Sequence, residues 1–217
     1  MPYRRTANVV TRLAARKESI VAAALGVAGE GGMAAIQIVP IAERADIAAG
    51  TVYRYFPGKI DLIGALIRSV SERELAAMRA AADAAPGPLS ALAAAIVTFA
   101  ARALRSRRLT YALIAEPVDA DVHTLRLVFW QMFADELAAR IRMAVADGHL
   151  PEQDAALSAP AVAGAILEGL IGPLAPAGEN AAADHAAVQM LTLFALRGLG
   201  VVDARARGIV VQTPMPE

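Results

Sequence analysis

Two short helical segments separated by a tight break restrict the fold of this chain more than any other feature of its sequence. The first covers about residues 38–45, the second covers about 48–56, and Asp46-Ile47 lies between them. Pro57-Gly58 ends the second segment abruptly, because proline disfavours helical geometry at the preceding residue and glycine permits a sharp turn. Two helices joined in this way have the proportions of a helix-turn-helix unit.

The rest of the chain also has a helical pattern. Hydrophobic residues make up 57% of the sequence, and much of that share is alanine, which has the highest helix propensity. Apolar residues such as Phe129, Phe133 and Leu137 recur at three- and four-residue spacing. We expect helices at about residues 12–29, 38–45, 48–56, 59–85, 89–106, 121–147, 155–172 and 184–199, with a further short segment near 107–115. The expected fold class is all-α, with no sheet.

Breaks rich in proline and glycine divide the chain into parts. Pro57-Gly58 closes the N-terminal helices, and "APGP" at 85–88 is the strongest linker-like break in the middle of the chain. We expect a three-helix domain with a basic N-terminal arm at residues 1–58, a larger helical domain at 59–204, and a loose tail at 205–217.

The net charge of zero hides an asymmetry along the chain. Residues 1–80 carry eleven Lys and Arg against seven Asp and Glu, whereas residues 81–217 carry ten against fourteen. The first 17 residues contain five cations and no acid. A basic N-terminal part on an acidic remainder indicates that the N-terminal part meets a polyanion.

Three of the ten aromatic residues in the chain fall in the second short helix, within "AGTVYRYFPGK". On a helical wheel Val52 and Phe56 share one face, which has core character, and Tyr53 and Tyr55 flank it. The tyrosine hydroxyls can donate hydrogen bonds to phosphate oxygens while the rings stay packed. The alternative is a surface helix whose tyrosines only pad a core.

The opposite face of the same helix suits a DNA groove. Thr51 and Arg54 point away from the core, and base edges in the major groove offer donors, acceptors and thymine methyls to such side chains. Lys59 begins the next helix, where its charge adds to backbone amides that already favour an anion. With the tight turn and the basic arm, this pattern favours DNA binding.

The stretch "IAERADIAAGTVYRYFPGK", residues 41–59, resembles the DNA-binding signature of the TetR/AcrR family of transcriptional regulators. In that signature Ile-Ala-x-x-Ala is followed by a turn and by Gly-Thr-x-Tyr-x-Tyr-Phe-x-x-Lys, and the resemblance covers about residues 15–65. It implies an N-terminal DNA-binding domain and a helical ligand-binding and dimerisation domain. It also implies a set of DNA-contacting residues: base contacts near Ala49 and Thr51, and phosphate contacts from Tyr53, Tyr55 and Lys59.

Three positions depart from the family pattern. Asp46-Ile47-Ala48 stands where Gly-Val-Ser is common, and Asp can adopt the left-handed turn conformation at modest cost. Ala48 gives up a side-chain cap worth about 1 kcal/mol. Gln37 stands where Ser or Thr often caps the preceding helix, and Ala28 replaces a bulky core aromatic. These departures predict a less stable N-terminal domain.

Candidate effector-binding residues in the second domain are few. Trp130 lies off the main apolar stripe of its helix, so it either lines a ligand cavity or packs in the core. The polar candidates for a pocket are Arg102, Tyr111, His123 and Glu168. A mostly apolar pocket with few polar anchors favours a small hydrophobic or aromatic effector.

Small residues are frequent in the last two expected helices, which therefore can approach a partner closely. The resemblance implies that these helices pair with a second subunit to form a symmetric homodimer. The expected interface residues are Ile166, Leu167, Leu170, Leu191 and Phe194. Burial of the same residues within one subunit is the alternative.

Other classes of function find little support. The chain has no cysteine, its three histidines are far apart, and it has no phosphate-binding glycine motif or serine nucleophile elbow. We therefore expect no catalytic residues, metal or cofactor, although a helical enzyme and a nonspecific architectural DNA-binding protein stay as alternatives. The longest apolar stretches, 89–101 and 186–196, are too short to span a bilayer.

The sequence thus predicts a cytoplasmic, homodimeric, ligand-responsive transcriptional regulator that represses by binding double-stranded operator DNA.

Overall fold

The computed structural model describes residues 7–176 and 180–216. Its elements in chain order are α1 (Ala7–Gly31), the short 3₁₀-helix η1 (Met33–Ala35), α2 (Ile38–Arg44), α3 (Ala49–Tyr55), α4 (Lys59–Asp83), α5 (Pro88–Arg105), α6 (Arg107–Ile114), α7 (Ala120–Ala146), α8 (Ala155–Ile171), α9 (Ala181–Gly198) and α10 (Asp203–Gln212). Every element in these described ranges is a helix, so the expected all-α class is confirmed. The expected helices are all present, with ends that differ by a few residues, and the expected short segment near 107–115 is the helix α6.

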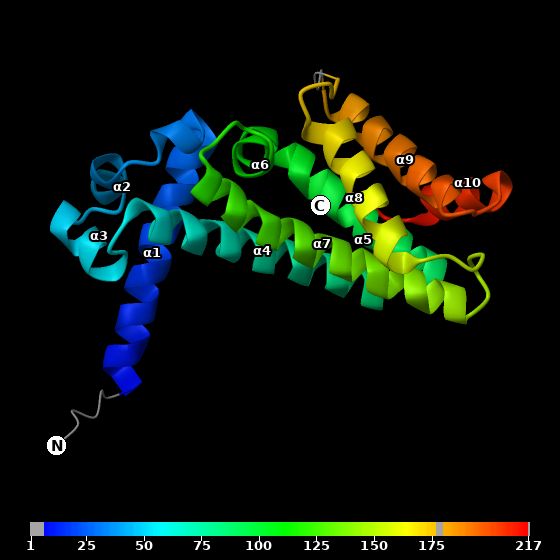
Figure 1. Cartoon of the computed structure of the whole chain (residues 1–217), viewed down its shortest axis with the longest axis horizontal. Helices are drawn as coiled ribbons and strands as arrows, with labels where there is room; N and C mark the ends of the chain where they lie inside the picture. The colour runs from blue at the N-terminus through cyan, green and yellow to red at the C-terminus, as the bar shows by residue number, and fades with distance from the viewer. Residues whose placement is uncertain (1–6, 177–179, 217) are drawn as a thin grey trace.

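The first three α-helices form a unit at one end of the molecule, which we call the head (Figure 1). Its core is built by Ile20 and Ala24 of α1, Ile41 of α2, Val52 of α3 and Phe56, all of which are buried. The helix α4 packs against α1 and then runs on along α5 and α7. One continuous helix therefore connects the head to the remaining helices α4–α10, which we call the body.

The central helix of the body is α5, which packs against α4, α7, α8 and α9. By length and composition alone, this 18-residue helix is apolar enough to cross a membrane, and it extends beyond the apolar stretch expected from the sequence. Within the subunit 72% of it is buried. Its apolar character is therefore accounted for by its place in the core.

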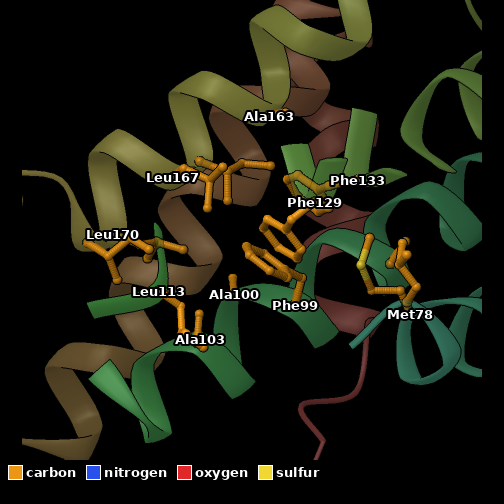
Figure 2. Close-up of a cluster of buried hydrophobic side chains, with 14 of the residues drawn as sticks. Met78, Phe99, Ala100, Ala103, Leu113, Phe129, Phe133, Ala163, Leu167 and Leu170 are labelled. Carbon is orange, nitrogen blue, oxygen red and sulfur yellow. The ribbon is translucent and has the colours of Figure 1, made fainter. Parts of the chain in front are cut away.

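Three phenylalanines join α5 to α7 at the middle of the body (Figure 2). The ring centroids of Phe99 and Phe133 lie 4.3 Å apart, and those of Phe129 and Phe133 lie 6.2 Å apart with nearly parallel planes. Leu137 and Ile141 continue the buried stripe of α7. The apolar periodicity of this helix was thus a correct guide to the face that packs in the core.

The expected tail at 205–217 is wrong for most of its length, because residues 203–212 form α10. Ala206 and Val210 are buried, which holds this helix against the body. Asp203 in its first turn accepts a hydrogen bond of 2.7 Å from Nε of Arg197, and this contact holds the pKa of Asp203 below its ordinary value. A short C-terminal helix therefore packs against α9 where the sequence suggested irregular structure.

Candidate DNA-binding surface and effector cavity

Asp46 makes the turn between α2 and α3. Its φ is 51°, in the left-handed region that aspartate tolerates better than most residues. The N–H of Ile47 donates a hydrogen bond of 3.0 Å to the carbonyl of Ala42, which fixes the chain reversal. The predicted left-handed aspartate is confirmed, and Ala48 indeed gives α3 no side-chain cap.

Two core residues fix α3 to the rest of the head. Val52 and Phe56 are buried, as the helical wheel predicts. The ammonium of Lys17 in α1 lies 5.5 Å from the centroid of the Phe56 ring, so a cation–π contact covers the ring from outside. With this face buried, the opposite face of α3 must point to solvent.

The solvent-facing side of α3 and the start of α4 carry the predicted DNA-contacting residues. Tyr53 is 53% exposed, and Arg54 and Lys59 are also exposed. Ala49, Thr51 and Tyr55 are half-buried. Among the described residues no carboxylate forms an ion pair with Arg54 or Lys59, so both charges are available to an anionic partner.

The N-terminus of α4 is partly capped by its own sequence. The N–H of Gly58 donates a hydrogen bond of 2.8 Å to Oδ2 of Asp61. This carboxylate already interacts favourably with the positive end of the helix dipole. A phosphate at this end is therefore expected to be held by the side chain of Lys59 more than by the first amides of α4.

A cavity of about 410 Å³ lies in the body between α4, α5, α6 and α7. Its apolar wall includes Ile67, Val70, Phe99, Leu109, Leu113 and Phe129. Its polar groups include Ser71, Arg73, Glu74, Arg102, Arg105 and Thr110. The volume is within the range of small-molecule sites, which are typically 300–1,000 Å³.

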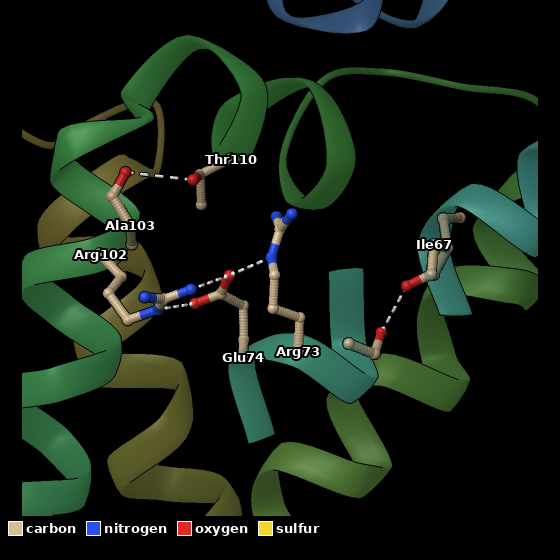
Figure 3. Close-up of polar contacts among 7 residues, drawn as sticks. Ile67, Arg73, Glu74, Arg102, Ala103 and Thr110 are labelled. Carbon is tan, nitrogen blue, oxygen red and sulfur yellow. Dashed lines mark hydrogen bonds and ion pairs between the residues drawn. The ribbon is translucent and has the colours of Figure 1, made fainter. Parts of the chain in front are cut away.

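Glu74 is the centre of the polar part of the cavity (Figure 3). Its Oε2 accepts a hydrogen bond of 2.5 Å from Nε of Arg102, and its Oε1 accepts one of 3.0 Å from a terminal nitrogen of the same guanidinium. Nε of Arg73 lies 3.3 Å from the same Oε1. The hydrogen bonds to Glu74 raise the pKa of Arg102 above its ordinary value. One carboxylate is thus shared by two guanidinium groups.

The helix α6 lies between this cavity and the head. Leu109 and Leu113 of α6 line the cavity, while α6 also packs against α1. Just after α6, Oε2 of Glu116 accepts a hydrogen bond of 3.0 Å from the N–H of Met33 in η1. A movement of α6 in the cavity wall would therefore act directly on α1 and η1 of the head.

Arg126 of α7, which the sequence analysis did not single out, fixes the end of α6 by hydrogen bonds. It is 4% exposed and donates hydrogen bonds of 2.5 Å to the carbonyl oxygens of Ala112 and Glu116. Burial lowers its pKa, and its Nε has no partner among the described residues. Its place on the apolar face of α7 is the signal that could have singled it out.

Residues 20–66 match the family model described as bacterial regulatory proteins, tetR family. The HTH-type transcriptional repressor KstR of Mycolicibacterium smegmatis is 45% identical over 58 residues, which are 27% of this chain and 28% of that relative. KstR of Mycobacterium tuberculosis is 46% identical over 48 residues, 22% of each chain. Residues 20–66 therefore form a DNA-binding domain of the tetR family. The match spans only about a quarter of the length of these curated relatives.

Solved structures extend the likeness of fold to nearly the whole of this chain. RolR in complex with resorcinol has a TM-score of 0.68 at 19% identity, over 96% of this chain and 98% of that one. FadR from Bacillus subtilis in complex with stearoyl-CoA has a TM-score of 0.62 at 17% identity, over 91% and 98%. At these identities the likeness establishes that the body has the same fold.

Of the five residues predicted for the effector pocket, Arg102 lines the cavity and the other four do not. Only Phe129 of α7 lines the cavity, and Trp130 is turned about 100° away from it on the helix. His123 and Glu168 are exposed, and Tyr111 lines a separate open hollow beside Ile171. The sequence did not reveal which residues of α6, α7 and α8 line a cavity.

The predicted interface residues divide into two groups. Ile166, Leu167 and Leu170 are buried inside the subunit, so their assignment to the surface between subunits is wrong. Leu191 is half-buried and packs beside Gly169. Phe194 alone of the five is largely exposed, at 60%. The inward face of α8 was therefore mistaken for its outward face.

Proposed function

We propose that this chain is a homodimeric TetR-family repressor that releases operator DNA when a small hydrophobic or aromatic effector occupies the cavity. The observation that carries the proposal is the presence in one chain of a helix-turn-helix head and a cavity of about 410 Å³ in the body. The family relatives named above are transcriptional repressors, which supports repression rather than activation. We place the protein in the cytoplasm, where operator DNA is accessible.

The proposed division of labour follows the helices. Residues 1–58 bind DNA, although residues 1–6 of the expected basic arm lie outside the described residues. Residues 59–204, together with α10, bind the effector and form the dimer. Within the head, Thr51 and Ala49 read base edges, while Tyr53, Tyr55 and Lys59 hold phosphates and Arg54 adds positive charge.

Effector binding acts on the head through α6 and α4, which both touch the cavity and α1. A ligand shifts the DNA-competent population only by its differential affinity for the two states of the protein. A coupling of about 1–3 kcal/mol lowers operator affinity roughly 5–150-fold, and DNA then weakens effector binding by the same factor.

Selection of binding sites from a random DNA pool tests the proposed function. A dimeric regulator is expected to recover a palindromic sequence and to prefer it over random DNA by roughly 10³-fold or more. Thr51→Ala is expected to relax the preference at about one base pair in each half-site, at a cost of roughly 1–3 kcal/mol there. Recovery of no motif by the unmodified protein overturns sequence-specific regulation, and an unchanged motif from Thr51→Ala removes the threonine from base reading.

Lys59→Ala is expected to weaken DNA binding about equally for all sequences, because a phosphate contact carries no sequence information. The slope of log affinity against log salt concentration is expected to flatten by about one unit. Arg142→Ala is the matched control, since Arg142 is an exposed cation on α7 in the body. Fluorescence anisotropy at several salt concentrations measures both variants, and equal slopes for the two remove Lys59 from the DNA contacts.

A further inference from the structure

We propose that the effector of the cavity is an amphipathic acid, a molecule with an apolar body and an anionic head, held at its head by Arg73, Arg102 and Arg105. The inference rests on the proposed function only in treating this cavity as the effector site. It restricts the proposed effector from any hydrophobic or aromatic molecule to one that carries an anionic group.

The charges of the cavity wall carry this inference. Among the described residues, three arginines line it, at positions 73, 102 and 105, and Glu74 is the only acidic residue in its lining. Three arginines and one glutamate give the lining a formal charge of +2. Among the described residues no carboxylate pairs with Arg105. A concave wall with a net positive charge raises the local concentration of anionic ligands.

Glu74 is poorly placed to receive a cationic ligand. Its two oxygens already accept the three contacts from Arg73 and Arg102, at 2.5–3.3 Å. A cation would have to displace a guanidinium from the carboxylate and would then face the displaced charge. An anion meets no such obstacle, since the terminal nitrogens of Arg73 make no hydrogen bond with another described residue and stay free to donate.

The guanidinium of Arg73 extends past Glu74 in Figure 3. The Arg73 side chain is half-exposed and that of Arg102 is 29% exposed, so an arriving head group meets both before it is fully desolvated. The fork of N–H donors on a guanidinium matches the two oxygens of a carboxylate or phosphate. The head of the ligand is therefore expected to lie over this group, at the exposed side of the cavity.

The remaining wall fits an apolar body. Phe99 and Phe129 present aromatic rings, and Leu113 adds an aliphatic surface. The hydroxyl of Ser71 donates to the carbonyl of Ile67 at 2.7 Å, as the hydroxyl of Thr110 does to a carbonyl of α5 at 3.0 Å. A hydroxyl has one proton, so each of these groups can only accept from the ligand. A hydroxyl on the ligand body can donate to either of them.

Two kinds of molecule share this chemistry. One is a free carboxylic acid, whose carboxylate lies on the arginines. The other is an acyl thioester of coenzyme A, whose acyl part fills the cavity of about 410 Å³ while its phosphates lie outside near Arg73 and Arg105. The two differ in whether the anionic group is the carboxylate itself, and experiment can separate them.

Matched ligands test the sign of the charge. Phenylbutyrate, phenylbutyramide and phenylbutylamine share one body and differ in the head, and decanoate, decanamide and decylamine repeat the series with an aliphatic body. Each ligand is titrated into the protein without DNA and its binding is measured by calorimetry. The acids are expected to bind at least about tenfold more tightly than their amides, and the amines are expected to bind more weakly than the amides. The coenzyme A thioesters of both acids are titrated beside them.

Variants of the arginine group make the test specific to this site. Arg73→Gln is expected to weaken the acids roughly tenfold and to leave the amides unchanged, because only the acids use the charge. Arg68→Gln is the control, an exposed cation of the same helix outside the cavity lining. Glu74→Gln is expected to tighten the acids, since it removes the only negative charge of the wall, whereas a purely structural role would predict weaker binding of all ligands.

The possible outcomes separate the inference from the proposed function. If the acids bind more tightly than the amides and Arg73→Gln weakens their binding, the inference is supported with a free acid as ligand. Tighter binding of the thioesters with the same sensitivity supports it with a coenzyme A conjugate. Equal or tighter binding of the amides or amines overturns it, as does the failure of all the acids and thioesters to bind below millimolar concentration. None of these binding measurements involves DNA. The selection of a palindromic operator therefore tests the proposed function separately from the charge of the effector.

Discussion

Leu170→Glu is expected to unfold the subunit instead of releasing a folded monomer. Leu170 is 2% exposed on the inner side of α8, near Leu113 and Ala103 (Figure 2). The substitution places a carboxylate among buried apolar side chains, and an uncompensated buried charge costs about 3–5 kcal/mol in comparable sites. The lost packing of the leucine adds to this cost. Since domains are stable by about 5–15 kcal/mol, the sum removes much or all of the stability.

Urea denaturation followed by circular dichroism measures this effect. The variant is expected either to lose its cooperative transition or to show a midpoint at much lower urea concentration. Leu127→Glu is the matched control, because Leu127 is exposed on α7 and the same substitution there is expected to change stability by about 0.5 kcal/mol or less. A cooperative Leu170→Glu monomer with unchanged stability would show that the inner face of α8 is not buried in the subunit.

The elements of the head could be predicted almost completely from the sequence. Its signals are local: Pro57-Gly58 ends α3, and Asp46 supplies the one special backbone conformation that the turn needs. The wheel of α3 then separates Val52 and Phe56 from the exposed residues, because the period of a helix alone fixes that division. Where a rule acts over a few residues, a single sequence is enough.

The outward and inward faces of α8 could not be separated in this way. Apart from Ser158 and Glu168, the helix consists of apolar residues, glycine and one proline, so its periodicity selects no face. Packing against α5, α7 and α9 decides which residues are buried, and that packing depends on contacts between distant parts of the chain. The error over Leu170 follows directly from this lack of a polar face.

The cavity shows the same limit. Arg102 could be singled out as a polar residue in an apolar helix, but its partner Glu74 is 28 residues away, on a different helix. Nothing in a single sequence places α4 beside α5 with these two residues in register. The helix α10 was missed for another reason, since Gly208 and adjacent β-branched residues give "RGIVVQ" low helix propensity, and packing of Ala206 and Val210 overrides it.

Phe194→Glu is expected to separate the proposed dimer and to leave the fold of the subunit intact, the reverse of the result for Leu170. Phe194 of α9 is exposed, as is Met190 one turn before it, and Leu157 is exposed on the neighbouring helix α8. An exposed apolar surface of this kind is typical of a surface that meets a partner. In a two-fold symmetric interface the same residue is contributed by both subunits, so one substitution introduces two charges.

The size of this effect follows from the place of the phenylalanine in the proposed interface. A large aromatic residue near the centre of an interface typically contributes 2 kcal/mol or more, and unpaired charges in its place cost further. The dimer is therefore expected to dissociate at least about a hundredfold more readily. A monomer reaches only one half-site, so its affinity for the palindrome is expected to fall toward that for random DNA.

Sedimentation equilibrium over a range of concentrations measures the dissociation of Phe194→Glu, and anisotropy with operator DNA measures its binding. Val128→Glu is the matched control, because Val128 on α7 is 59% exposed, close to the 60% of Phe194, and lies on neither α8 nor α9. The control is expected to stay dimeric and to bind the operator normally. If Phe194→Glu stays dimeric as well, the subunits meet at another surface. If it is monomeric and still binds the palindrome with full affinity, recognition of the operator does not require the dimer. Either result would contradict the proposed assembly while leaving the helix-turn-helix of the head in place.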